Sequence, residues 1–263
     1  MKKISKRFLE TIYTKYNKSE YVHPDPLEFL YNYPRLEDRE IVGLIASSLA
    51  YGTVTQILKS VQSILSYLGP HPYEKLKTCT ARELNDVFKT FKHRFTTGRE
   101  ISVFLYAMRE TIKNYGSLEQ CLLNGYKERH ETLEDSLTFF VQNIKKVSRS
   151  SLATLLPCVE KGSACKRLNL YLRWMIRKDA VDRGGWNLPP SKLLIPLDTH
   201  MHYFSLRYDF TERKNADIKT AREITKHFKR FNSDDPTKYD FAITRYGIRK
   251  ELSWQDLETK FFK

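Results

Sequence analysis

Residues 155–167 read LLPCVEKGSACKR, and this stretch combines a proline, a glycine and a serine at short intervals. We expect a helix that ends at Pro157, a tight turn at Gly162 and a second helix that starts near Ser163, because proline ends helices and glycine adopts turn conformations easily. The backbone amides at the start of a helix point outward and attract anions. The stretch therefore predicts a hairpin between two helices that can hold a phosphate group.

Apolar residues recur at helical spacing on both sides of this hairpin. The pattern predicts helices over residues 41–65, interrupted at Gly52 by a bend or a point of close approach, and over 101–115, 132–147, 165–178, 199–208, 216–231 and 239–246. Clusters of Gly, Pro, Asn and Asp predict a loop at 184–190 and a turn at 232–236 that precedes a helix. Strand-like alternation is weak throughout, so the sequence predicts an all-α protein.

The composition excludes several classes of protein. The chain has 263 residues, 41% of them hydrophobic, which excludes a disordered chain, and 10 Gly and 10 Pro exclude a fibrous one. It lacks a run of about 18 uncharged apolar residues, and its basic start is not followed by the apolar core of a secretory signal. The four cysteines are widely separated and form no CxxC pair, which disfavours a zinc ribbon or a four-cysteine cluster. We therefore expect a cytoplasmic protein with no membrane contact.

Positive charge suggests a partner. Lys and Arg number 45 against 31 Asp and Glu, a formal net charge of +14, and residues 161–178 contain no acidic residue. Basic residues alternate there with Tyr171 and Trp174, which suits phosphate contacts and base stacking. On a helix, Lys166, Arg173 and Arg177 lie within about 40° of one another, a stripe that predicts a solvated or phosphate-facing surface. Charge alone does not decide between a solvated basic surface and a surface that binds nucleic acid.

A second informative stretch is LIPLDTHMHYF, at residues 194–204. Pro196 favours an extended chain before it, and Asp198 then stands where a helix begins, so one interpretation of Asp198 is an ordinary N-cap. The run Ile195–His200 also resembles the apolar-Pro-apolar-Asp-x-His motif of the helix-hairpin-helix DNA glycosylases, in which it follows the hairpin. The resemblance implies a helix-hairpin-helix glycosylase-like fold, with two helical subdomains flanking a cleft for DNA and the extruded base.

The resemblance is specific over roughly residues 150–246. It implies a single unit over 1–263, with subdomains at about 35–150 and 151–250 and with residues 1–34 packing against either. The whole chain also resembles an uncharacterised bacterial family of similar length, with LAYG at 49–52, HRFTTGR at 93–99 and DPTKYDFA at 235–242 as landmarks.

The same resemblance implies roles for particular residues. Asp198 would be the catalytic carboxylate, and a lysine at the start of the second hairpin helix would be the nucleophile. Lys166 fits that place best. Lys161 is the alternative, because Cys158 replaces the usual glycine and the turn is longer than usual. The long separation between Lys166 and Asp198 is most similar to that of the archaeal-type 8-oxoguanine glycosylases, which lack an iron–sulfur cluster.

Further residues are candidates for contacts with DNA. Those expected at the phosphate backbone are Gly162, Ser163, Arg167, Arg173 and His200. Those expected at the base pocket are Gln56, Trp174, Trp186 and Tyr239. A flipped base needs a stacking face and amide-type hydrogen bonders, which these residue types supply.

The resemblance implies a base-excision repair glycosylase with lyase activity at abasic sites, and 8-oxoguanine is the leading substrate. Its partner would be double-stranded DNA containing a damaged base, and it would act at the nucleoid as a monomer, without cofactor or metal. One alternative is a helix-hairpin-helix module that binds DNA without chemistry. A second is a metal-dependent hydrolase that uses Asp198, His200 and His202, but two histidines two residues apart diverge by about 200° on a helix.

Overall fold

The computed structural model describes residues 4–148 and 152–261. The protein is mostly helical, as the sequence predicts, and contains one two-stranded hairpin. The chain divides into two compact units. Unit 1 comprises both ends of the chain, Met1–Val22 and Gly162–Lys263, and unit 2 comprises His23–Lys161. The subdomain boundary expected at residues 150 and 151 lies outside the described residues. Within the described ranges, no helix has the length and apolar character needed to cross a membrane.

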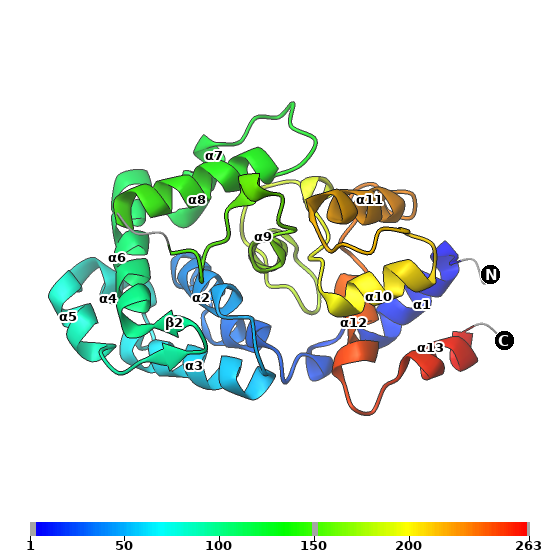
Figure 1. The fold of residues 1–263 in the computed structure, drawn as a ribbon, viewed down its shortest axis with the longest axis horizontal. Coiled ribbons are helices and arrows are strands. Elements are labelled where there is room, and N and C mark those ends of the chain that lie inside the picture. Colours follow the sequence, from blue (N-terminus) through cyan, green and yellow to red (C-terminus); the bar gives the residue numbers. More distant parts are fainter. Residues whose placement is uncertain (1–3, 149–151, 262–263) are drawn as a thin grey trace. The chain divides into compact units, whose positions relative to one another are not determined.

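Unit 1 is built from helices that are far apart in sequence. Its elements are α1 (Lys6–Tyr16), η1 (Ser19–Tyr21), α9 (Lys166–Ile176), η4 (Pro190–Lys192), α10 (Thr199–Arg207), α11 (Ile218–Lys229), α12 (Asp240–Ile248) and α13 (Trp254–Phe261). Helix α12 packs against α1, α10 and α13, and Figure 1 shows the blue α1 beside it. The N-terminal helix is therefore held by the C-terminal part of the chain.

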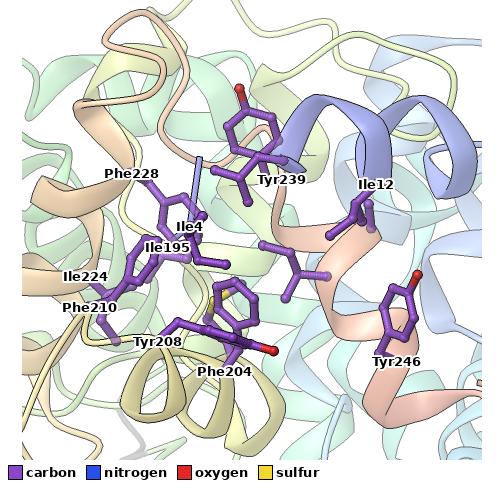
Figure 2. Packing of buried hydrophobic residues seen from close by; sticks show 14 of the residues in the cluster. Ile4, Ile12, Ile195, Phe204, Tyr208, Phe210, Ile224, Phe228, Tyr239 and Tyr246 are labelled. Atoms are coloured by element: carbon purple, nitrogen blue, oxygen red, sulfur yellow. The ribbon is translucent and has the colours of Figure 1, made fainter. Parts of the chain in front are cut away.

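Aromatic side chains fill the core of unit 1. The ring centroids of Phe210 and Phe228 lie 4.7 Å apart, and those of Phe204 and Phe210 lie 5.6 Å apart. Figure 2 shows part of this core, in which Phe210, Ile224 and Phe228 are grouped together. Ile224 and Phe228 are four residues apart on α11 and so lie on one face of that helix. The helical spacing of apolar residues thus directs one side of α11 into the core.

Unit 2 is a continuous segment. Its elements are η2 (Pro26–Asn32), α2 (Leu36–Ser48), α3 (Val54–Leu68), α4 (Pro72–Thr78), α5 (Ala81–Val87), β1 (Lys92–His93), β2 (Thr96–Thr97), α6 (Gly98–Tyr115), α7 (Leu118–Asn124), α8 (Glu134–Ser148) and η3 (Val159–Lys161). Helix α6 packs against α5, α7 and α8, and α2 packs against η2, α3 and α4.

The single helix expected over 41–65 is in fact two helices. Helix α2 ends at Ser48 and α3 starts at Val54. Between them Gly52 adopts a φ of +101°, a conformation that glycine tolerates and other residues rarely adopt. Thr53 then caps α3, because its side-chain oxygen accepts a hydrogen bond from the Gln56 amide at 3.4 Å. The apolar spacing is correct for each helix, but the chain turns at Gly52 rather than bending.

The expected hairpin also differs in its first half. Residues 152–156 form one helical turn, in which the Leu156 amide donates to the Leu152 carbonyl at 2.8 Å, so within the described residues no longer helix ends at Pro157. A 3-10 turn, η3, follows. The expected turn at Gly162 is present with a φ of +78°, and Cys165 adopts a φ of +47° immediately before α9. The second hairpin helix therefore begins at Lys166 rather than near Ser163.

Candidate active site

Asp198 occupies the N-cap position of α10 in an extended backbone conformation. Its Oδ1 atom accepts a hydrogen bond from the Met201 amide at 2.7 Å. The preceding residues Ile195 and Leu197 are buried in the core of unit 1, and the Ile195 amide donates to Thr225 Oγ1 at 3.0 Å. The half-buried Asp198 side chain is therefore held in place by its neighbours. Within the described parts of the chain, its Oδ2 atom makes no hydrogen bond.

A second carboxylate lies close to Asp198. Asp240, the first residue of α12, is only 2% exposed. Burial raises the pKa of Asp240 to about 6; the charge of Arg173 opposes this rise, and the nearby charge of Asp198 adds to it. Among the described residues, the buried Oδ1 atom of Asp240 has no hydrogen-bond partner. Two acidic groups, Asp198 and Asp240, therefore lie close together at the N-terminus of α10 in unit 1.

Arg173 connects this region to α9. Its side chain forms a hydrogen-bonded ion pair with Asp240 and a second one with Asp182, in which Nη2 and Oδ1 are 3.2 Å apart. Arg173 is 3% exposed and Asp182 is fully buried. The expected contact between Arg173 and a DNA phosphate is therefore wrong for this conformation, because protein carboxylates cover the guanidinium.

Arg177, one turn further along α9, is buried in the same way. Its Nε atom donates to Asp235 at 2.8 Å and its Nη2 atom donates to Asp179 at 2.8 Å, and Nη1 is bound to Asp182. The sequence predicts that the stripe of Lys166, Arg173 and Arg177 faces solvent or phosphate. At Arg173 and Arg177 it faces the interior of unit 1 instead. Asp235 and Asp240, both in the 235–242 landmark, supply partners to this pair of arginines.

Lys166 lies at the start of the same helical face. It is the first residue of α9, and Arg173 lies seven positions further along, which corresponds to a rotation within about 20° and a rise of about 10 Å. Lys166 is half-buried, and among the described residues its side chain makes no hydrogen bond or ion pair. Arg173 contacts Asp240, and Asp240 lies near Asp198. Lys166 therefore lies on the side of α9 that faces these two carboxylates.

The rest of the hairpin is anchored to α11. The Gly162 carbonyl accepts a hydrogen bond from the Ile218 amide at 3.0 Å, and Ser163 forms a bridge with Asp217. No side chain caps α9, and its first turn contains no acidic residue. Arg167 is half-buried in that turn. The alternative nucleophile, Lys161, is exposed at the end of η3 and belongs to unit 2.

The two histidines of the 194–204 stretch have different neighbours. The His200 ring packs against Gly247, where an added Cβ atom would lie 2.1 Å from Nδ1. The His202 Nε2 atom is 2.8 Å from the carbonyl oxygen of Arg213. Both residues are on a helix, as the sequence predicts. In residues 4–148 and 152–261, no group of three or more His, Cys, Asp or Glu side chains is arranged to hold a metal ion.

Three of the residues expected at a base pocket are buried in unit 1. Trp174 is 1% exposed, and Trp186 packs edge to face against Tyr171 with ring centroids 5.0 Å apart. Tyr239 donates from its hydroxyl to Glu10 at 2.6 Å. None of the three rings offers an open stacking face in this conformation, which corrects that expectation. Gln56 is exposed, at the start of α3 in unit 2.

Sequence reasoning missed the role of Asp240. The available signal was the segment LYLRWMIR at residues 170–177, in which two arginines stand four residues apart among apolar residues on every side. Such a helix is buried all round, and buried arginines require carboxylate partners. The 235–242 landmark contains two aspartates that meet this requirement.

Comparison with known proteins places the chain in a family. It belongs to the family described as "Protein of unknown function (DUF2400)", whose model matches residues 25–249. The matched range includes the hairpin, Lys166, Asp198 and Asp240. No curated protein and no solved structure matched the chain.

Proposed function

We propose that this member of the DUF2400 family is a DNA glycosylase of the helix-hairpin-helix type that removes a damaged base and then cleaves the abasic strand. The observation that supports it most is the position of Asp198, which caps α10 close to Asp240, the carboxylate that Arg173 of α9 binds. Asp198 keeps one carboxylate oxygen without a hydrogen bond in the described residues, and Lys166 extends from the face of α9 that carries Arg173.

Asp198 would act electrostatically. When the bond between a base and C1′ of its sugar breaks, positive charge develops on the sugar, as it does in glycoside hydrolysis generally. A fixed carboxylate beside that sugar stabilises the charge most strongly where water is excluded. The N-cap bond from Met201 holds Oδ1, so Oδ2 would face the substrate without any rearrangement of the helix.

Lys166 would act as the nucleophile. Its neutral amine attacks C1′, the N-glycosidic bond breaks, and the base leaves with the bonding electrons and takes up a proton. Opening of the sugar ring then gives a protonated imine between Nζ and C1′. Loss of the C2′ proton breaks the C3′–O bond and cleaves the strand, and water finally hydrolyses the imine. Every step uses only the protein, the DNA and water.

The hairpin would hold the duplex. Gly162, Ser163 and Arg167 lie at the uncapped start of α9, where backbone amides favour an anion. His200 remains a second candidate for a backbone contact. A formal net charge of +14 supports attraction to double-stranded DNA, and binding would weaken as salt rises. The protein would act as a monomer without a cofactor, on DNA at the nucleoid.

The test uses duplexes that each contain one damaged base, beginning with 8-oxoguanine, and measures base release and strand cleavage. Borohydride should trap a covalent complex between the protein and the lesion strand. Lys166→Gln should abolish trapping but retain duplex binding, whereas Lys161→Gln should be trapped like the wild type. Trapping lost only in Lys161→Gln would move the nucleophile to Lys161. Salt-dependent binding without release of any base would instead identify a non-catalytic DNA-binding protein.

A further inference from the structure

One apolar side chain in unit 2 is far more exposed than the other large exposed hydrophobic residues. Phe95 is 73% exposed, whereas Val87, the next, is 45% exposed. Phe95 lies at the tip of the hairpin formed by β1 and β2, in which His93 pairs with Thr96. An aromatic ring that projects into solvent gains nothing from burial within its own chain, and its face is accessible for stacking on a partner.

The hairpin that presents Phe95 is firmly supported. The His93 side chain is buried, with Nδ1 2.9 Å from Ser60 Oγ and Nε2 3.0 Å from the Tyr51 carbonyl oxygen. The Tyr51 hydroxyl in turn lies 2.6 Å from Thr96 Oγ1 and donates to the His93 carbonyl at 3.1 Å. These hydrogen bonds link both strands to Tyr51, in the segment before α3, and hold the tip of the hairpin in a projecting position.

Arg94 precedes Phe95 in a backbone conformation that favours glycine. Its φ is +51°, yet the position holds a long cationic side chain. The guanidinium carbon lies 5.5 Å from the centroid of the Phe95 ring. The Arg94 side chain also passes over Gly52, where an added Cβ atom would be 2.8 Å from Arg94 Cδ and 3.6 Å from Gln56 Oε1. Arg94, Phe95, Gly52 and Gln56 therefore form one continuous surface, termed here the Phe95 surface.

The sequence segments that supply the Phe95 surface are basic. Residues 87–99 contain four Lys or Arg residues, all exposed, namely Lys89, Lys92, Arg94 and Arg99, and no acidic residue. The segment 41–73, which includes α3, also contains no Asp or Glu. A projecting ring, an adjacent guanidinium, an exposed amide and surrounding cations match the features with which proteins bind single-stranded nucleic acid: stacking on bases and attraction of the backbone.

We propose that the Phe95 surface binds an unpaired nucleotide, with the Phe95 ring stacked on the base and Arg94 beside its phosphate. The inference goes beyond base excision, because it uses only unit 2 and requires no chemistry at Asp198. Because Gln56 lies beside Arg94, it would be next to the bound base. The proposal also accounts for an arginine at a turn position where glycine would be less strained.

The test compares two fluorescent oligonucleotides of equal length, a thymidine strand and a strand made entirely of abasic residues, binding to the full chain. Phe95→Ala should weaken binding to the thymidine strand by roughly tenfold, which corresponds to about 1.4 kcal/mol of stacking. Binding to the abasic strand should remain unchanged, because that strand offers phosphates but no ring to stack. Phe95→Trp should retain binding to both strands.

Val87→Ala is the matched control, since it also removes an exposed apolar side chain from unit 2. The thymidine strand contains no damaged base and the assay measures binding alone, so a failure of the glycosylase proposal leaves this result unaffected. Equal binding of the thymidine strand by wild type and Phe95→Ala would overturn the proposal, as would an equal loss on both strands. So would a Phe95-dependent affinity for vesicles of anionic phospholipid with none for the oligonucleotides.

Discussion

The guanidinium of Arg173 in α9 is paired with the carboxylate of Asp240 in α12, in the interior of unit 1. This pair joins the helix that begins with Lys166 to Asp240, whose carboxylate lies close to Asp198. Burying both charges is unfavourable in itself, and removing one partner leaves the other uncompensated in a region of low polarity.

Arg173→Ala should therefore destabilise the protein by about 3–5 kcal/mol, because Asp240 and Asp182 would lose a buried partner. Urea denaturation followed by circular dichroism measures this. Arg167→Ala, in the first turn of the same helix, serves as the control and should change the unfolding free energy by less than about 1 kcal/mol. It should instead weaken binding to damaged and undamaged duplexes alike. Similar stabilities for the two variants would show that the Arg173 pair is dispensable.

Asp240 should make stability depend on pH. Its pKa in the folded protein, about 6, lies above its ordinary value of 3.8, mainly because of burial. Between these values the folded state holds the proton more tightly than the unfolded state. Protonation of Asp240 therefore makes its full contribution to stability below about pH 4, and this contribution is lost as the pH rises through about 6.

Asp240→Asn does not titrate, so it shows this effect directly. From pH 4 to 7 the unfolding free energy of the variant should rise relative to the wild type by on the order of 3 kcal/mol. Burial also raises the pKa of Asp182, but that contribution is present in both proteins. Parallel stability curves for the two proteins over this range would exclude a raised pKa at Asp240.

Asp198→Asn should separate capping from catalysis. Asparagine accepts the Met201 hydrogen bond as aspartate does, so stability should stay within about 1 kcal/mol of the wild type. Base release should fall by about two to three orders of magnitude, because asparagine carries no charge to face the sugar cation. Single-turnover excision from the lesion duplex is the measurement.

Asp217→Asn is the control for this experiment. Asp217 caps α11 with nearly the same backbone angles, and its Oδ1 accepts from the Thr220 amide at 2.9 Å. It should lose no excision chemistry once bound. If Asp198→Asn unfolds the protein, the residue is a structural cap; if it excises at the wild-type rate, the proposed catalytic role is wrong.

Gly247→Ala should disturb His200. The new methyl group would overlap the imidazole, so the ring must move, and the expected destabilisation is about 1–3 kcal/mol. Duplex affinity should fall as well if His200 contacts the DNA backbone. The double variant His200→Ala/Gly247→Ala removes the overlap. The double variant should lose less stability than the sum of the losses in the two single variants. If the losses simply add, the contact between position 247 and His200 makes no energetic contribution.

Helix positions in the second half of the chain follow from the sequence because local signals agree there. The ranges expected at 199–208, 216–231 and 239–246 correspond to α10, α11 and α12 within two residues at each end. Asp198 marks the start of α10 by its position after Pro196, and it does cap that helix. The hairpin of β1 and β2 escapes such reasoning, since two-residue strands are too short to show alternation.

The error at Arg173 has a different origin. Local sequence shows that Arg173 and Arg177 share a helical face, but it does not show what lies opposite. Their partners include Asp182 and Asp240, one on a nearby loop and the other far along the chain. A charged stripe and a buried ion-pair network look identical until the tertiary partners are known. The same limit applies to the tryptophans, whose burial is set by packing and not by spacing.

The first helix of unit 1 is synthesised long before the residues that hold it. Glu10 accepts hydrogen bonds from Lys238 and Tyr239, and α1 packs on α12 through a face that includes Leu9 and Ile12. Glu10 and Lys238 are 228 positions apart. At translation rates of about 5–20 residues per second, the apolar face of α1 waits on the order of ten seconds or more for its partner. Unit 2 is contiguous and has no such delay. On the ribosome, therefore, the middle of the chain can fold first, while α1 remains a segment that chaperones can bind.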